Sequence, residues 1–115
     1  MPSEPFEVER LDRGVLSFHG PLTVENVGPF LSAVRRENTP TVILDFTGVP
    51  YLDSSGLGSL ISACTSFAKA GRRVALTGVN QRVRKVFEIT KVERALLVFP
   101  TLSDALEALS NAGTA

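Results

Sequence analysis

A change in the spacing of apolar residues organises the middle of the chain, between Thr41 and Ala70. The β-branched and apolar run at residues 42–44 predicts a strand, and the Gly-Val-Pro sequence at 48–50 predicts a turn after it. From residue 57 the apolar positions follow the spacing i, i+3, i+4, i+7 and i+10, which is typical of one face of an α-helix. These positions are Leu57, Leu60, Ile61, Cys64 and Phe67. The segment Asp53-Ser54-Ser55-Gly56 therefore lies where a helix begins.

Asp53 and Ser54 both suit the N-cap of this helix, because their side-chain oxygens can accept hydrogen bonds from the unpaired N–H groups of the first turn. That turn also carries the positive end of the helix dipole. Gly56 and Gly58 are unexpected here, since each costs about 1 kcal/mol relative to alanine inside a helix. We infer that something approaches the backbone closely. Close packing of the helix on the sheet and contact with a partner account for the glycines equally well.

The other segments alternate between strand and helix patterns. Strands are predicted at residues 6–11, 15–18, 41–46, 72–77 and 95–99, the first at a sheet edge with one wet face. Helices are predicted from near Pro29 to the polar residues 35–38, at 54–70, at 81–88 and from Thr101 or Ser103 onward. Gly28-Pro29 argues against an earlier start of the first helix. Residues 1–5 are expected to be a frayed terminus, and 89–94 a connection. The positions of the last helix expected to face the core are Leu102, Ala105, Leu106 and Leu109.

The order of these elements predicts an α/β fold. The short turn at residues 12–14 joins the first two strands as an antiparallel hairpin. The later alternation of strands and helices implies right-handed crossovers and a mostly parallel sheet. In such a sheet the loops at the carboxyl ends of the strands share one edge. The loops at residues 19–23, 50–58 and 78–81 should therefore be neighbours, with Ser54 at the centre of the surface that they form.

Composition narrows the possible functions. With 115 residues and 43% hydrophobic content, residues 1–115 fit a single domain with an ordinary core. The 12 basic and 12 acidic side chains balance, so no overall field draws the chain to nucleic acid or to an anionic membrane. Without a signal-peptide pattern or an apolar run that could cross a bilayer, we expect a soluble, cytoplasmic chain with no membrane insertion. Cys64, the only cysteine, is expected in the core.

Candidate chemistry is sparse. His19 is the only histidine and is expected to be a surface or packing residue, because no second histidine can join it in a metal site. A serine hydrolase would need the motif Gly-x-Ser-x-Gly. Leu52 stands two residues before Ser54, and Asp53 two before Ser55, so neither serine fits. We therefore expect no catalytic residue, no metal site and no cofactor.

Two motifs resemble the STAS domain family, the sulfate transporter and anti-sigma factor antagonist group. The first is Leu52-Asp53-Ser54-Ser55-Gly56-Leu57-Gly58, which follows the strand at residues 42–46. The second is Val83-Arg84-Lys85-Val86-Phe87-Glu88. The similarity covers about residues 6–109. It implies a mixed, mostly parallel five-stranded sheet flanked by helices, no catalytic activity and a regulatory switch.

In the antagonist branch, the resemblance implies one protein partner, an anti-sigma factor that is also a serine kinase. The unmodified domain binds this partner and frees the sigma factor; the kinase then phosphorylates the serine after the Asp, here Ser54, and binding is lost. Other roles in the family stay open: a subunit of a stress-signalling assembly, a soluble component of a lipid transporter, or a nucleotide-binding module. The residues expected to contact the partner are Thr23, Asp53, Ser54, Ser55, Gly56, Leu57, Gly58 and Asn80.

The chain departs from this branch at one place. The branch commonly has Gly-Glu-Leu-Asp where residues 20–23 here are Gly-Pro-Leu-Thr, so Thr23 replaces an acidic side chain that lies near the modified serine. The departure bears on phosphorylation by the usual kinase and not on the fold.

A switch at Ser54 also has a physical basis in the residues themselves. A phosphate adds about 1.5 to 2 negative charges. That charge is tolerated at a helix N-terminus, where N–H groups point at it, but it is costly to desolvate in a packed interface. The simpler alternative is that Ser54 only caps the helix, and Ser55 is expected to be structural or a secondary modification site. Similarly, Arg82, Arg84 and Lys85 are expected on a solvated helix face, or at the rim of the partner site.

Overall fold

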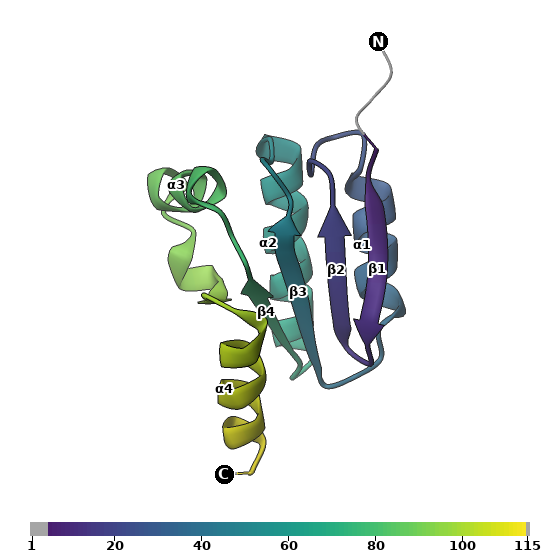
Figure 1. The fold of residues 1–115 in the computed structure, drawn as a ribbon, viewed down its shortest axis with the longest axis vertical. Coiled ribbons are helices and arrows are strands. Elements are labelled where there is room, and N and C mark those ends of the chain that lie inside the picture. Colours follow the sequence, from purple (N-terminus) through teal and green to yellow (C-terminus); the bar gives the residue numbers. More distant parts are fainter. Residues whose placement is uncertain (1–4, 115) are drawn as a thin grey trace.

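The computed structural model describes the backbone of residues 5–114 and the side chains of residues 5–109. It shows a five-stranded sheet with helices on both faces (Figure 1). Most of the frayed terminus expected at residues 1–5 therefore lies outside the described residues. The strands are β1 (Glu7–Asp12), β2 (Val15–His19), β3 (Thr41–Gly48), β4 (Arg73–Thr77) and β5 (Leu97–Phe99). The helices are α1 (Val27–Arg36), α2 (Ser54–Lys69), α3 (Gln81–Thr90) and α4 (Leu102–Thr114), with a 3-10 turn, η1 (Glu93–Ala95).

The strands lie side by side in the order β1-β2-β3-β4-β5. β1 pairs antiparallel with β2, and the other three pairs are parallel. This confirms the predicted α/β fold, with its antiparallel edge strand and β3 in the centre. Because β2, β3 and β4 run in the same direction, the loops that follow them emerge at one edge of the sheet.

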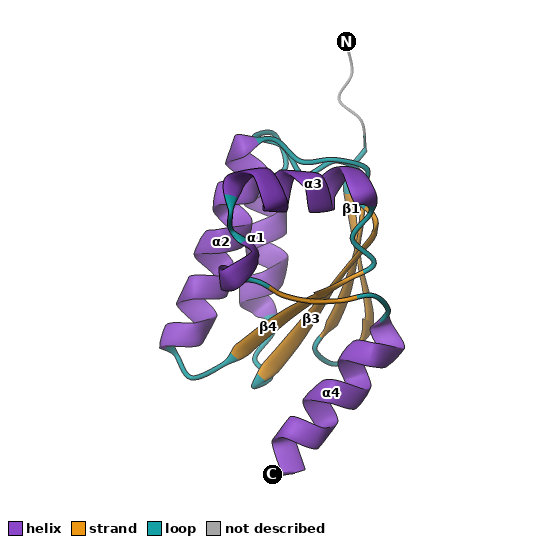
Figure 2. Ribbon diagram, turned by 90° about the vertical axis from the view of Figure 1, so that its left-hand side faces the viewer, coloured by secondary structure: helices purple, strands orange, loops and turns teal. Residues whose placement is uncertain are grey.

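Helices α1 and α2 cover one face of the sheet, and α4 covers part of the other (Figure 2). The alternation along β2 and β3 sends Leu16, Phe18, Leu44 and Phe46 to the first face, where they are buried. Phe30 of α1 meets them, with its ring centroid 5.1 Å from that of Phe18. The smaller cluster on the α4 face is Val15, Ile43, Ala75 and Ala105. The larger core therefore fixes α2, and with it the helix start at Ser54, against the sheet.

Helix α1 begins at Val27, two residues before Pro29, which confirms the predicted start near Pro29. Pro29 is the third residue of the helix, where its missing N–H would have no partner within the helix. Asn26 precedes α1, but its side chain does not cap the helix. Instead, Asn26 Nδ2 donates to the carbonyl oxygen of Pro21 at 2.7 Å and holds the loop before α1.

Two boundaries near the C-terminal half also differ from the prediction. α3 continues through Thr90, whereas the sequence analysis left residues 89–94 as a connection. β5 has only three residues, because Ala95 belongs to η1. Leu96 lies between η1 and β5 and is buried in the larger core. The predicted strand at 95–99 is thus shortened at its start.

Helix α4 is capped by Thr101, one of the two predicted caps, whose Oγ1 accepts a hydrogen bond from the N–H of Asp104 at 3.1 Å. Ala105 is fully buried against the sheet, as expected. The prediction that Leu106 faces the core was wrong, since Leu106 is 48% exposed. One short helix covers part of the sheet face, so only a narrow stripe of α4 is buried.

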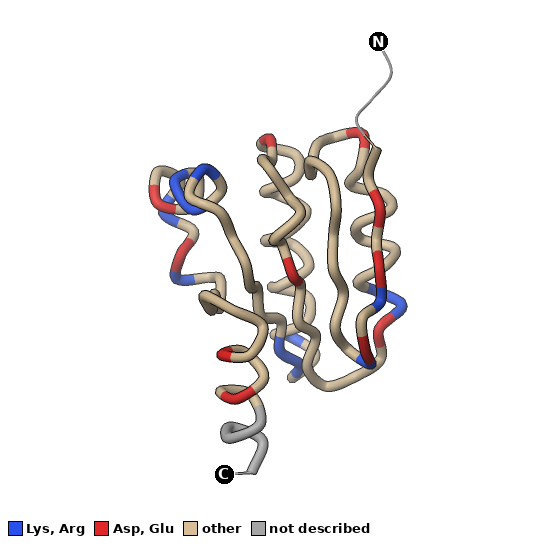
Figure 3. The backbone as a smooth tube through the Cα atoms, viewed as in Figure 1, with Lys and Arg blue, Asp and Glu red and all other residues tan. Residues whose placement is uncertain are grey.

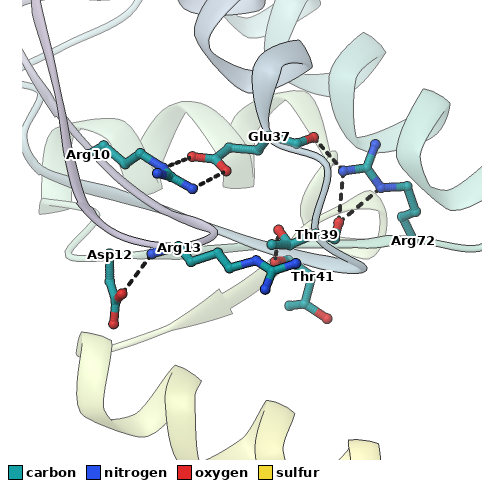
Figure 4. A network of polar contacts seen from close by, with 7 residues as sticks. All are labelled: Arg10, Asp12, Arg13, Glu37, Thr39, Thr41 and Arg72. Atoms are coloured by element: carbon teal, nitrogen blue, oxygen red, sulfur yellow. Dashed lines mark hydrogen bonds and ion pairs between the residues drawn. The ribbon is translucent and has the colours of Figure 1, made fainter.

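A polar network joins the elements at the edge of the sheet where β3 and β4 begin (Figure 4). Arg10 donates to the carboxylate of Glu37 with nitrogen-to-oxygen distances of 2.7 and 3.4 Å, and the Glu37 side chain is only 5% exposed. Arg72 Nη2 donates to the backbone carbonyls of Glu37 at 2.6 Å and Thr39 at 2.8 Å. These contacts join β1, the loop before β3 and the segment after α2.

Candidate functional site

The loops that follow β2 and β3 are in direct contact at the carboxyl edge of the sheet, as predicted. Leu22 and Leu52 form a short parallel bridge. The N–H of Leu22 donates to the carbonyl of Tyr51 at 3.1 Å, and the N–H of Asp53 donates back to the carbonyl of Leu22 at 3.2 Å. The first residue of α2, Ser54, comes directly after this bridge, so the bridge holds the start of the helix in place.

Asp53 is the N-cap of α2. Its Oδ1 accepts a hydrogen bond from the N–H of Gly56 at 2.8 Å, and its Oδ2 accepts one from the N–H of Val24 at 3.1 Å. The bond from Gly56 lowers the pKa of the carboxyl below its ordinary value of 3.8; burial opposes this effect and the bond from Val24 adds to it. Asp53 is therefore ionised at neutral pH and joins the 20–26 loop to the first turn of α2.

Ser54 and Ser55 are both exposed at the start of α2. The sequence analysis expected free N–H groups of the first turn to receive added charge at Ser54. One of these N–H groups is already engaged, because Asp53 Oδ1 accepts the hydrogen bond from Gly56. Ser54 itself is exposed and comes directly after the Asp53 cap.

The two unexpected glycines differ in their surroundings. A Cβ atom at Gly56 would overlap the carbonyl oxygen of Leu22 and lie 2.8 Å from its carbonyl carbon. Gly56 is thus required by the close approach of the 20–26 loop to α2. A Cβ at Gly58 would meet nothing within 4 Å, and the residue is exposed. Packing within the chain therefore explains Gly56 and leaves Gly58 open to a partner.

Asn80 joins the third loop to the other two. As the N-cap of α3, its Oδ1 accepts a hydrogen bond from the N–H of Val83 at 2.8 Å. Its Nδ2 donates to the carbonyls of Val49 at 3.2 Å and Pro50 at 3.1 Å. The three predicted loops are therefore neighbours, and the Asn80 side chain is engaged within the chain.

Thr23 and Leu57 complete the set of predicted site residues. Both are half-buried, and Leu57 packs against the larger core. Thr23 accepts a backbone hydrogen bond from the N–H of Asn26 at 2.8 Å, which forms the turn before α1. Thr23 thus belongs to the loop that Asp53 holds.

Val24 and Tyr51 at this edge were missed by the sequence analysis, whereas Arg82 was expected on a solvated helix face or at the rim of the partner site. Val24 donates its backbone N–H to Asp53 and leaves its own side chain 66% exposed. Arg82 lies over the ring of Tyr51, with Cζ 4.8 Å from the ring centroid. No sequence pattern could reveal these contacts, because each joins segments that are about 30 residues apart.

The described residues also show whether this part of the chain holds a metal-binding cluster, a membrane-spanning helix or a groove. In residues 5–114, no group of three or more His, Cys, Asp or Glu side chains is placed to hold a metal ion. None of the helices in that part has both the length and the apolar character that a bilayer crossing requires. A groove of about 790 Å³ lies between β1 and α1, lined by residues such as Val8, Pro29 and Arg36, and does not include Ser54. At the Ser54 edge itself, Ser54, Ser55 and Gly58 are exposed.

Comparison with known proteins gives a consistent picture. A family model described as "STAS domain" matches residues 6–105. The chain is 33% identical over 66 residues to the TM1081 homolog of Thermotoga neapolitana, a match that covers 57% of this chain and 58% of that protein. It is 28% identical over 68 residues to the anti-sigma-B factor antagonist of Staphylococcus aureus, covering 59% of this chain and 63% of that protein. The matched region thus spans less than two thirds of either relative.

Solved structures show the same arrangement of strands and helices. The anti-sigma factor antagonist SpoIIAA in its unphosphorylated form gives a TM-score of 0.69 at 21% identity, covering 93% of this chain and 97% of that one. The phosphorylated form of SpoIIAA, a Bacillus cell fate determinant, gives a TM-score of 0.63 at 21% identity, covering 91% of this chain and 99% of that one. At these identities the likeness shows a shared fold.

Proposed function

The chain belongs to the STAS domain family, and we propose that it is an anti-sigma factor antagonist whose binding is controlled at Ser54. In the unmodified state it binds an anti-sigma factor that is also a serine kinase, in the cytoplasm. Phosphorylation of Ser54 by that kinase then causes the complex to dissociate. The observation that carries the proposal is the exposed position of Ser54 at the first residue of α2, directly after the N-cap Asp53 and two residues before the buried Gly56.

The proposed modification is an ordinary phosphoryl transfer. The Ser54 hydroxyl oxygen forms a bond to the γ-phosphorus of ATP, the bond between that phosphorus and the β,γ-bridging oxygen breaks, and ADP leaves. A base of the kinase takes the hydroxyl proton. This chain contributes an accessible hydroxyl on a rigid helix start, and the catalytic groups belong to the partner.

The effect of the phosphate follows from where it would lie. About 1.5 to 2 negative charges are added outside the core, so solvent can stabilise them and the fold is retained. In a packed interface the same charges must be desolvated, and the Asp53 carboxylate beside them adds repulsion. Binding is thus expected to be lost without unfolding.

The predicted contact residues divide into two groups in this proposal. Ser54, Ser55 and Gly58 would contact the partner because they are exposed, and the half-buried Thr23 would do so from the loop beside them. Asp53, Gly56, Leu57 and Asn80 would mainly hold that edge in shape through contacts within the chain. Because Thr23 replaces the acidic residue of related sequences, the cognate kinase must recognise the loop without a carboxylate at position 23.

The experiment uses the purified chain and each anti-sigma factor kinase of the source organism, also purified. Binding is measured by calorimetry with the wild type, Ser54→Ala, Ser54→Asp and the control Ser55→Asp. We expect at least one kinase to bind the wild type and Ser54→Ala, and to lose affinity for Ser54→Asp by more than about tenfold, with a smaller effect of Ser55→Asp.

With ATP present, mass spectrometry should locate one phosphate on Ser54, and none should form on Ser54→Ala. Melting temperatures of all four proteins should agree closely. If no kinase binds the wild type, or if Ser54→Asp binds as well as the wild type, the proposal is wrong.

A further inference from the structure

Helix α3 begins at the edge of the fold that carries Ser54. Asn80 ties its first turn to the carbonyls of Val49 and Pro50, which precede α2. Arg82 lies over the ring of Tyr51, three residues before Ser54, with Cζ 4.8 Å from the ring centroid. Figures 1 and 2 both place α3 at the end of the sheet where α2 begins. The two helix starts therefore share one continuous surface.

One exposed face of α3 carries both basic side chains and an apolar side chain. Val83 and Phe87 bury the opposite face in the core. Arg82, Lys85 and Ile89 are spaced i, i+3 and i+7, which places them along one exposed face of the helix; we call them the α3 stripe. Ile89 is 69% exposed, which is the largest exposed fraction among the large apolar side chains of the described residues. Such a side chain is unusual on the same helix face as two cationic residues.

The charge of this region is not balanced locally. Helix α3 carries Arg82, Arg84 and Lys85 against the single acidic residue Glu88, and Figure 3 shows the basic positions gathered on this helix. Among the described residues, none of the three basic side chains forms an ion pair within the chain. The chain as a whole has no net charge, so this positive charge is local and not part of an overall field.

We propose that the α3 stripe is a second contact of the interface that contains Ser54, and that it binds an acidic protein surface with an apolar pocket for Ile89. This rests on the proposed function, because the occupant is the anti-sigma factor kinase itself. Two features support it: the stripe is continuous with the Ser54 edge through the Arg82–Tyr51 contact, and its charge calls for an acidic partner. The stacking also restricts the Arg82 side chain before binding, which reduces the entropy cost of the contact.

The two kinds of residue in the stripe should act on different rate constants. Charges at the rim of an interface mainly accelerate association, and their effect falls as salt is added. An apolar side chain that enters a pocket mainly slows dissociation. These two signatures distinguish specific docking from a general effect of net charge.

The test measures association and dissociation rates of the kinase that binds the wild type, by biolayer interferometry at several salt concentrations. Arg82→Glu and Lys85→Glu are compared with Arg84→Glu, which makes the same charge change on the other flank of the helix. We expect the first two to lower the association rate on the order of tenfold at low salt. Arg84→Glu should have a much smaller effect, and all differences should shrink at high salt.

Ile89→Ala should raise the dissociation rate on the order of tenfold, because the lost contact is apolar. Arg82→Gln serves as a milder variant that removes the positive charge without reversing it, and melting temperatures verify that each variant folds. Equal association rates for Arg82→Glu and Arg84→Glu, with kinase binding by Ser54→Asp still impaired, would overturn the proposed role of the α3 stripe. The Ser54 proposal would remain intact. Binding of a labelled single-stranded oligonucleotide that depends on Arg82, with unchanged kinase rates, would also overturn it.

Discussion

Asp53 and Val24 are joined by a hydrogen bond of 3.1 Å between the carboxylate and the backbone N–H, although 29 residues separate them. The other carboxylate oxygen caps α2 through Gly56 at 2.8 Å. A single side chain therefore sets the position of the 20–26 loop relative to the helix start that carries Ser54. The shape of the candidate site depends on this carboxylate remaining ionised.

The first prediction concerns the pH dependence of stability. The hydrogen bonds lower the pKa of Asp53 in the folded state, so the unfolded state binds more protons as the pH falls below the ordinary value of 3.8. The stabilisation from Asp53 is therefore complete above that value and is lost as the pH falls through the lower folded pKa. Urea unfolding between pH 7 and pH 2.5 measures this.

Two variants of Asp53 separate charge from geometry. Asp53→Ala should lower the free energy of unfolding by about 1 kcal/mol at pH 7, because it removes the N-cap. Asp53→Asn keeps an oxygen acceptor, so it should retain most of the stability and lose only the acid-dependent part. Identical pH profiles for the wild type and Asp53→Asn would contradict the assigned role.

The second prediction compares the two glycines of α2. Gly56→Ala should destabilise the fold by about 1 to 3 kcal/mol, because the added methyl overlaps the backbone of Leu22. Gly58→Ala adds a methyl in open space and should stabilise the helix by up to about 1 kcal/mol. Chemical unfolding of the two variants gives both values. Equal effects of the two substitutions would contradict the close approach between Gly56 and the backbone of Leu22.

Gly58→Ala also tests the proposed interface. If the partner approaches the exposed backbone at Gly58, this variant should be more stable than the wild type and yet bind the anti-sigma factor kinase less tightly. Stability and affinity would then change in opposite directions, which loss of folding cannot explain. Unchanged affinity would remove Gly58 from the interface.

The third prediction concerns Arg72. Its guanidinium donates to the carbonyls of Glu37 and Thr39 and lies 4.0 Å from the ring centroid of Phe67. Arg72→Ala should lower the free energy of unfolding by about 2 kcal/mol, since it removes charged hydrogen bonds and a cation–π contact. Arg73→Ala, at the exposed neighbouring position, is the control and should have little effect. Comparable losses for both variants would mean that the network does not contribute specifically.

The fourth prediction concerns Cys64. Burial raises the pKa of its thiol from 9.0 to about 11. At pH 8 the thiolate fraction is therefore about 100-fold lower than for an ordinary cysteine, and the side chain is only 9% exposed. Reaction with a chromogenic disulfide reagent should be at least 100-fold slower in the native protein than in urea. Rapid labelling of the native protein would place Cys64 outside the core.

Local patterns were enough to predict the order of elements and the position of Ser54. The change from strand spacing to helix spacing after residue 50, and the capping chemistry of Asp53, depend only on residues close in the chain. The meeting of three loops at one edge followed from the alternation of strands and helices alone. Local rules were less successful at the ends of elements, as at Thr90, which α3 includes, and at Ala95, which belongs to η1.

Tertiary structure decided what the sequence left open, because these features depend on segments that meet only after folding. The same residue type has different roles at Gly56 and Gly58, since one faces the backbone of Leu22 and the other faces solvent. Leu106 is exposed because α4 covers only part of its sheet face. By itself, therefore, the sequence determined which segments form strands and helices and where Ser54 lies along them. Packing between distant segments determined which of the neighbouring side chains support that serine and which remain free to meet a partner.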